Sequence, residues 1–188
     1  MKYEQRIVAF LDILGFKSLL DETVDKDGND IEVKIDSVVS AYQAIRDVWD
    51  LDNGLELAEF KKANSKQVSI FSDSIVVSFK VDDPSQVFLT LLEIKHVIML
   101  LLSRKILCRG AVAIGKFIHT ENYLFGPALV EAYTLESKAA MYPRVILDNS
   151  VIEVSSTYSG VHHSSKTEKE FVKSLLEQDS DGMYYVDY

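Results

Sequence analysis

Two acidic residues lie where carboxylates are unusual, and together they could bind a divalent cation. Asp12 interrupts an apolar run over residues 7–13, and Asp73 lies in a short Ser-Asp-Ser segment between two apolar runs. An ionised carboxylate in apolar surroundings is costly unless it is paired or binds a metal. Either residue alone is equally well explained as a turn or capping residue. On neighbouring strands of one sheet, the two would form a hard oxygen site for Mg²⁺ or Mn²⁺.

The segments that must position these residues alternate between strand and helix patterns. We expect strands over residues 6–13, 106–117, 144–147 and 183–186, and a hairpin over 68–79 with Asp73 at its tip. Helices are expected over 31–49, 86–103, 126–141 and 167–176, with a helical turn at 16–20. Residues 52–54 (Asp-Asn-Gly) would end the first long helix, and residues 23–30 and 157–165 would be loops. A hairpin between helices predicts an α+β fold, a ferredoxin-like antiparallel sheet with helices on one face.

The bulk properties limit the classes of function. The chain has 188 residues, which predicts a single domain over 1–188. A net charge of -9 argues against nucleic acid as a partner, although a bound cation would still allow a nucleotide. Cys108 is the single cysteine, which fits a reducing compartment and a packing role. Asp12 interrupts the N-terminal apolar run, which argues against a signal peptide. The longest apolar run elsewhere, residues 97–102, is too short to cross a membrane. We therefore expect a cytoplasmic protein without a membrane partner.

Four blocks resemble, in order, the signature blocks of class III nucleotidyl cyclases. They are FLDILGF at 10–16, SDSIVVS at 72–78, RGAVAIG at 109–115 and FGPALVEAYTLESKA at 125–139. The resemblance covers residues 7–147 and implies the cyclase fold with two Mg²⁺ or Mn²⁺ ions. It implies that Asp12, Asp73 and the backbone at Ile13 bind these metals. The backbone from Ile13 to Phe16 would contact the β- and γ-phosphates, with Gly15 permitting close approach. Arg109 is a candidate phosphate contact.

The sequence departs from the purine cyclases at several positions. Their helical block carries an Asn and, four residues later, an Arg; the corresponding residues here are Val130 and Thr134. Arg144 is our candidate for a substitute catalytic cation, with Lys138 behind it, although a solvated surface charge is the favoured explanation for either residue alone. The positions that read the base hold Ser69 and Tyr123 instead of charged residues.

These departures favour a smaller base. The segments at 126–139 and 143–148 are most similar to the bacterial pyrimidine cyclases of the Pycsar anti-phage systems, which make cyclic UMP or cyclic CMP. The resemblance thus implies UTP or CTP as substrate. With one set of blocks per chain, it also implies a homodimer whose active sites lie between the two chains.

Two alternatives to an enzyme stay open. A nucleotide sensor without catalysis is motivated by Val130 and Thr134, and a dimerisation module without any ligand is the simplest hypothesis. The other notable residues have mainly structural explanations. They are Tyr42 and Trp49 on a helical stripe (Tyr42 could also line a base pocket), His96 on a helix, His119 in a turn, Glu136 near the pocket, and His162 and His163 in a loop. No P-loop or Rossmann motif is present.

Overall fold

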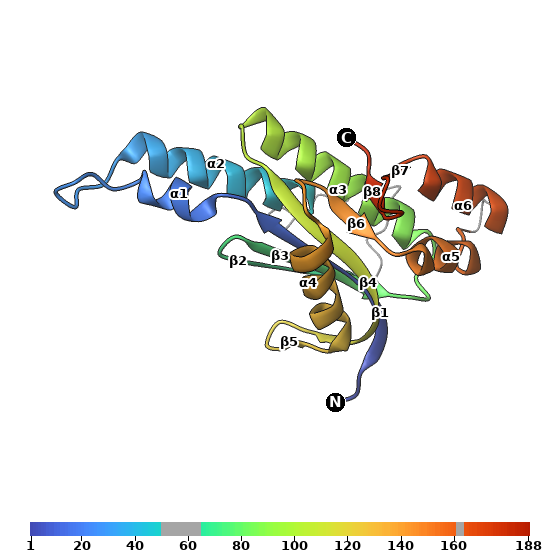
Figure 1. The fold of residues 1–188 in the computed structure, drawn as a ribbon. Helices are drawn as coiled ribbons and strands as arrows, with labels where there is room; N and C mark the ends of the chain where they lie inside the picture. The colour runs from blue at the N-terminus through green and yellow to red at the C-terminus, as the bar shows by residue number, and fades with distance from the viewer. Residues whose placement is uncertain (50–64, 161–163) are drawn as a thin grey trace.

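One mixed β-sheet runs through the molecule, with helices on both of its faces (Figure 1). The computed structural model describes residues 1–49, 65–160 and 164–188. In chain order the elements are β1 Glu4–Ile13, α1 Phe16–Asp21, α2 Glu32–Val48, β2 Gln67–Phe71, β3 Ser74–Lys80, α3 Gln86–Ser103, β4 Cys108–His119, β5 Leu124–Phe125, α4 Pro127–Ala139, β6 Val145–Leu147, α5 Asn149–Thr157, α6 Ser165–Lys173, β7 Leu176–Gln178 and β8 Tyr184–Val186.

The first half of the sheet has the predicted ferredoxin-like order. The strands run β2-β3-β1-β4-β6-β8-β7, and β5 pairs with the end of β4. The contacts of β1 with β3 and β4, and of β2 with β3, are antiparallel. The expectation of a wholly antiparallel sheet is wrong at one place, because β6 lies parallel to β4. Parallel neighbours need a crossover connection, and here α4 belongs to the segment that makes it.

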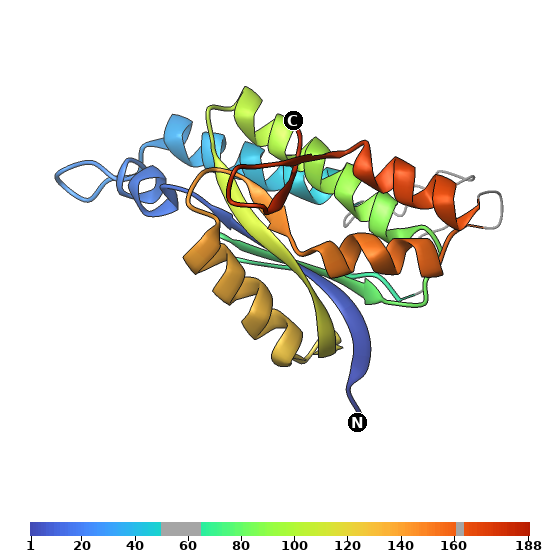
Figure 2. The ribbon, with the colours of Figure 1, turned by 45° about the vertical axis from the view of Figure 1, so that its right-hand side comes forward.

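The apolar residues of β1 alternate between two cores. Ile7, Ala9 and Leu11 belong to the large core that also contains residues of α2 and α3. Val8 and Phe10 face the other way and pack with Ala128 and Ala132 of α4. The expectation of helices on one face only is therefore wrong. Because both faces of β1 are apolar, helices must cover both faces of the sheet. Figure 2 shows α4 on the side of the sheet opposite α2 and α3.

The helix α3 occupies the predicted residues 86–103. By length and composition alone it is apolar enough to cross a membrane, and 44% of it is buried within the molecule. Its buried side chains include Leu91, Ile94, Val97 and Leu101, which lie in the large core. The same apolar composition is expected of a core helix, so it carries no case for a membrane segment.

The C-terminal third holds the elements that the sequence pattern did not predict. The helix α5 was missed because NSVIEVSST is rich in β-branched residues and serine, which are weak helix formers. Asp148 caps this helix by accepting a hydrogen bond of 2.8 Å from the Ser150 N–H, and Val151 and Ile152 are buried. The last predicted helix ends early, and β7 follows it. Residues 52–54, His162 and His163 lie outside the described residues.

Candidate active site

The sheet register brings Asp12 and Asp73 together. Asp12 lies near the end of β1 and pairs with Ser74, the residue after Asp73. The Ile13 N–H also donates a hydrogen bond of 2.9 Å to the Asp73 carbonyl oxygen. On the other side of β1, Asp12 pairs with Arg109 of β4. Two carboxylates from distant parts of the sequence and one guanidinium therefore meet at one edge of the sheet.

The surroundings of Asp12 disfavour a negative charge in the absence of a cation. Burial, followed by the nearby charges of Asp73 and Glu136, raises the pKa of Asp12 to about 6, while Arg109 acts in the opposite direction. The same burial and charge act on two neighbours. Burial and then Asp73 raise the pKa of Tyr42, and burial and then Asp12 raise the pKa of Cys108 to about 12, which leaves its thiol protonated and inert.

Arg109 is held by a buried carboxylate on α4. Its Nε donates to Glu136 Oε1, and the Glu136 side chain is only 3% exposed. Ser137 Oγ donates a further hydrogen bond of 2.9 Å to Glu136 Oε2. About a third of the Arg109 side chain stays exposed, so its outer nitrogens can still reach an anion. Glu136 was only a weak candidate on sequence grounds, since spacing alone does not reveal which strand its helix covers.

The predicted phosphate cradle is partly occupied by the protein itself. The N–H groups of Ile13 and Leu14 donate to the carbonyl oxygens of Asp73 and Leu107. Gly15 adopts φ 72°, a left-handed conformation that suits glycine, and begins α1. The Phe16 side chain is buried and makes an edge contact with Tyr42, with ring centroids 6.1 Å apart. Only the backbone of Phe16 can therefore take part in phosphate binding.

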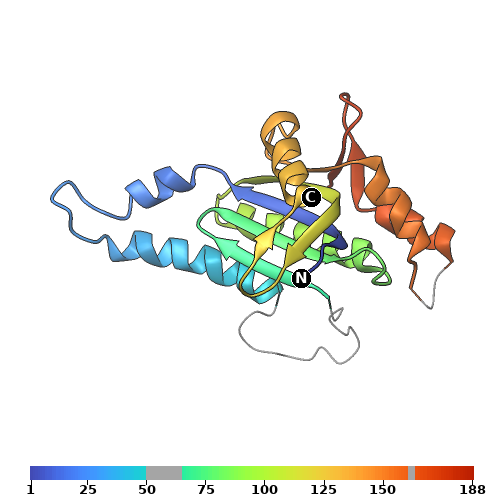
Figure 3. The same ribbon diagram turned by 90° about the horizontal axis from the view of Figure 1, so that it is seen from below.

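The turn that carries Asp73 is fixed from two sides. Ser72 has φ 52°, a conformation that costs free energy for a residue other than glycine. The Tyr42 hydroxyl donates to the Ser72 carbonyl oxygen. Figure 3 shows the tip of the β2–β3 hairpin between the end of β1 and α2, which carries Tyr42. Tyr42 therefore supports the turn that carries Asp73.

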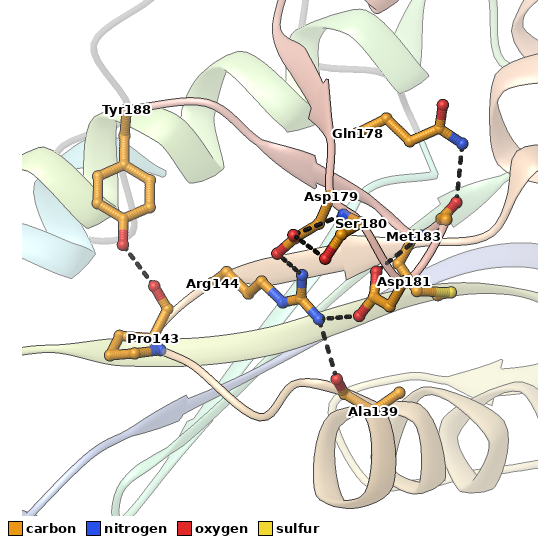
Figure 4. Close-up of polar contacts among 10 residues, drawn as sticks. Ala139, Pro143, Arg144, Gln178, Asp179, Ser180, Asp181, Met183 and Tyr188 are labelled. Atoms are coloured by element: carbon orange, nitrogen blue, oxygen red, sulfur yellow. Dashed lines mark hydrogen bonds and ion pairs between the residues drawn. The ribbon is translucent and has the colours of Figure 1, made fainter.

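Arg144, the predicted substitute catalytic cation, makes its contacts away from the Asp12–Asp73 pair. It is 4% exposed, and its terminal nitrogens donate to Asp179, Asp181 and the Ala139 carbonyl oxygen (Figure 4). These bonds fasten the β7–β8 hairpin to the end of α4. The contacts of Arg144 give it a structural role and no support for a catalytic one. Lys138 is exposed near the same end of α4.

Of the two base-reading candidates, Ser69 lies on the α4 face of the sheet, because it pairs with Val76, whereas Tyr123 lies in the connection between β4 and β5. Ser69 Oγ and His119 Nε2 are joined by a hydrogen bond of 2.9 Å. Tyr123 follows β4 and is 52% exposed. About 30 Å of strand separates Arg109 from His119 along β4. Tyr123 and the Asp12–Asp73 pair of one chain therefore cannot share a ligand.

A cavity of about 470 Å³ opens beside this second cluster. Its lining includes Arg6, Gln67, His119 and Thr120. His119, which we placed in a turn, ends β4 and is only 6% exposed. The sequence carried no signal for this burial, since it results from the packing of the β4 end onto β3.

The positions that hold Asn and Arg in the purine cyclases lie on α4 in this chain. Here Val130 is 65% exposed, and the Thr134 hydroxyl donates to the Val130 carbonyl oxygen.

Comparison with known proteins identifies the fold. No family model and no curated protein matches the sequence. Solved structures do match, among them the adenylyl cyclase CyaB from P. aeruginosa, with a TM-score of 0.58 and 13% identity over 100% of this chain and 95% of that one. The fold is that of the class III adenylyl cyclases. A class III adenylyl cyclase-like ATP-binding protein from Pseudomonas aeruginosa matches with a TM-score of 0.51 and 11% identity, over 92% of this chain and 40% of that one. At these identities the cyclase-like fold is shown and the activity is not.

The residues at the Asp12–Asp73 edge fit divalent cations. Their oxygens are hard ligands, and a cation would offset the repulsion that raises the pKa of Asp12. Within the described part of the chain, no group of three or more acidic, His or Cys side chains could hold a metal. Mg²⁺ commonly takes one or two carboxylates and completes its shell with water and substrate phosphates, so a pair suffices for a site shared with a nucleotide.

Proposed function

We propose that the protein is a pyrimidine nucleotide cyclase that converts UTP or CTP to the 3′,5′-cyclic monophosphate and pyrophosphate. The observation that carries the proposal is the pairing of Asp12 with Asp73 across β1 and β3 on a class III cyclase fold. A pyrimidine rather than a purine is favoured because the base-reading positions hold Ser69 and Tyr123. The resemblance to the Pycsar cyclases makes the product a second messenger in cytoplasmic anti-phage defence.

In this mechanism the chain supplies charge and position. Asp12, Asp73 and the backbone at Ile13 would hold two Mg²⁺ or Mn²⁺ ions. Such ions lower the energy of the attacking 3′-oxygen and of the leaving pyrophosphate in an in-line displacement. The exposed nitrogens of Arg109, anchored at Nε by Glu136, balance the charge of the triphosphate. The bond between the 3′-oxygen and the α-phosphorus forms as the bond to the pyrophosphate oxygen breaks, and the proton of the 3′-hydroxyl passes to water.

A homodimer completes the site. In one chain the Asp12–Asp73 pair lies near the start of β4, and Tyr123 follows the far end of this strand. Exposed apolar side chains also gather on the elements of the α4 face of the sheet, among them Phe71, Tyr123, Val130 and Tyr133. A partner that covers this face would bring the base-reading residues of one chain to the metals of the other.

A second candidate is a nucleotide sensor without turnover. Val130 and Thr134 offer neither the amide nor the cation that purine cyclases place on this helix, and Arg144 is engaged elsewhere. One of the structural matches is itself described as a cyclase-like ATP-binding protein. Such a sensor would bind metal and nucleotide at the same site as the enzyme, but it would form no cyclic product.

One experiment separates these candidates. The protein is incubated with each of the four NTPs and Mn²⁺, and cyclic products are measured by mass spectrometry. We expect a cyclic pyrimidine nucleotide from the wild type, and none from Asp12→Ala or Asp73→Ala although both variants stay dimeric. Turnover retained in either variant would refute the metal assignment. Triphosphate binding without pyrophosphate release would establish the sensor. No thermal shift with metal and any NTP would leave only a dimerisation module.

A further inference from the structure

The turn between β7 and β8 presents two carboxylates to one buried arginine. Each aspartate uses one oxygen within the turn itself. Asp179 Oδ1 accepts from the Ser180 N–H at 2.6 Å, and Asp181 Oδ1 accepts from the Met183 N–H at 3.0 Å. Their other oxygens accept from the two terminal nitrogens of Arg144 (Figure 4). The turn therefore fixes the two carboxylates, and they fix the guanidinium.

Arg144 in turn fastens the C-terminal end of α4. Its Nη2 donates to the Ala139 carbonyl oxygen at 3.2 Å, and Ala139 is the last residue of the helix. The last carbonyls of a helix have no partner within it and carry a partial negative charge, so a guanidinium suits this position. Met183 and Tyr185 also pack against the small apolar group that includes Ala140. The β7–β8 hairpin thus supports the last turn of α4.

The last turn of α4 carries Glu136, the residue that holds Arg109. Ala139 follows Glu136 by three residues, so both lie on the same side of the helix. The Glu136 side chain is buried and accepts from Arg109 Nε, so a shift of this turn would move the Arg109 guanidinium as well. Arg144 also touches the strand that carries Arg109, because its carbonyl oxygen accepts from the Gly110 N–H at 3.1 Å. Arg144 thus contacts the elements of both partners of this ion pair.

The two aspartates determine which anion Arg144 pairs with. The hydrogen bond from Arg144 lowers the pKa of Asp181, so this carboxylate is ionised near pH 7. Without the aspartates, Arg144, which is only 4% exposed, would be a buried cation without an anion, and that is costly. Glu136, on the helix turn that Arg144 already contacts, would then offer it a carboxylate. A Glu136 that turned to Arg144 would release Arg109.

We propose that Asp179 and Asp181 are positioning residues for Arg109, because by engaging Arg144 they leave Glu136 to hold Arg109 in place for phosphate binding. This inference rests on the proposed function, in which Arg109 contacts the triphosphate. It gives a role to a C-terminal hairpin that lies outside residues 7–147, the part of the chain that resembles the cyclases.

Calorimetric titration with inorganic pyrophosphate and Mg²⁺ tests this role without turnover. The test variant carries Asp179→Asn and Asp181→Asn, so each side chain keeps an oxygen for the turn and loses the charge that engages Arg144. We expect pyrophosphate to bind roughly tenfold more weakly, as the loss of one charge-assisted hydrogen bond allows. The affinity for Mn²⁺ without pyrophosphate should stay unchanged, because the proposed metal ligands are untouched.

The matched control is Glu153→Gln, which removes a half-exposed carboxylate from another ion pair of the C-terminal third, the one with Lys169. It should leave the affinity for pyrophosphate unchanged. A cycle with Arg109→Ala separates positioning from general damage to the fold. If the aspartates act through Arg109, the two asparagine changes should cost no further affinity in that background. Additive losses would refute an action through Arg109.

The inference and the proposed function can fail separately. Unchanged pyrophosphate affinity in the double variant, an equal loss of Mn²⁺ affinity, or a wild type that does not bind pyrophosphate would each overturn the inference. Cyclic products are measured independently by mass spectrometry. The expected loss of affinity, with no cyclic product from any NTP, would refute the cyclase and leave the role of the aspartates standing. A double variant that forms cyclic product with the wild-type KM would overturn that role and leave the cyclase intact.

Discussion

At the scale of single residues, the site consists of a charge placed where the fold disfavours it. Asp12 is the last residue but one of β1, in which every residue from Ile7 to Leu11 is apolar and buried, and Asp73 lies beside it. Without a bound metal, the repulsion between the two carboxylates lowers the free energy of unfolding. A bound cation would remove this repulsion, and that gain would add to the affinity for the metal. The carboxylate pair therefore has a measurable signature even without a nucleotide.

The signature is a pH dependence of unfolding. Because the pKa of Asp12 is raised to about 6 from 3.8, the protonated form favours the folded state. The stabilisation is fully present below about pH 4 and is lost as the pH rises through 6. In Asp12→Asn this part of the pH dependence disappears, so we expect the free energy of unfolding of the wild type to fall relative to the variant by on the order of 1 kcal/mol between pH 4 and 7, after allowance for solvent screening.

Urea denaturation of the metal-free proteins across this range measures the difference. Asp25→Asn is the control, because hydrogen bonds from Asn29 lower rather than raise the pKa of Asp25. Its difference from the wild type should not change between pH 4 and 7. A wild-type curve parallel to that of Asp12→Asn would show that Asp12 has an ordinary pKa, and would remove the electrostatic argument for a cation at this position.

At the scale of elements, the sequence predicted what depends on periodicity and not what depends on packing. Alternation and helical spacing gave β1, the β2–β3 hairpin and α3 nearly to the residue. The parallel β4–β6 pair and the position of α4 were missed, since periodicity does not say which face a helix covers. The same limit applies to side chains. Asp12 and Asp73 were found because each interrupts apolar strands and lies in a block that resembles the cyclases, whereas no local pattern marked the partners of Arg144 and His119.

The junction between β5 and α4 depends on a glycine. Gly126 has φ 154°, and a Cβ there would lie 2.5 Å from the Lys116 carbonyl oxygen and 2.8 Å from Phe117 Cα. Both neighbours are backbone atoms of β4 that cannot move without breaking the strand. We expect Gly126→Ala to lower the free energy of unfolding by about 2 kcal/mol or more.

Gly115→Ala provides the matched comparison. Gly115 lies on β4, the strand that Gly126 contacts, and has no positive φ. A Cβ added at Gly115 would meet Ala128 Cβ at 3.4 Å, an ordinary contact. Thermal unfolding should therefore place Gly115→Ala close to the wild type, within about 1 kcal/mol, and Gly126→Ala clearly below it. Equal melting temperatures for the two variants would mean that the β5–α4 junction relaxes freely, and that α4 is not rigidly held over β1.

At the scale of the whole molecule, the proposed function divides the residues of one chain into two half-sites. Asp12, Asp73 and Arg109 form a half that can hold metals and phosphates, and Ser69 with His119 and its cavity forms a half that can hold a base. A triphosphate bound to the first half of a chain cannot reach the Tyr123 of that chain, because β4 separates them. The second copy of the chain is then a structural requirement of the proposed reaction.

This requirement predicts complementation between two inactive variants. Asp12→Ala destroys the metal half, and Ser69→Arg fills the base half, so each homodimer should be inactive. In a heterodimer one site combines both defects, while the other takes its metal half from one chain and its base half from the other and is intact. Random assembly of equal amounts makes half of the dimers mixed, with one working site each, so about a quarter of the wild-type activity should return.

Co-expression of equal amounts of the two variants gives this mixture, and its cyclic nucleotide formation is compared with that of the separate variants. The control is the mixture of Asp12→Ala with Asp73→Ala. Both changes lie in the metal half, so every site in that heterodimer keeps one defect and no activity should return. If the two mixtures behave alike, the site lies within one chain. Ser69 and Asp12 of the same chain would then read one nucleotide, since Ser69 pairs with Val76 and Asp12 with Ser74, two residues apart on β3.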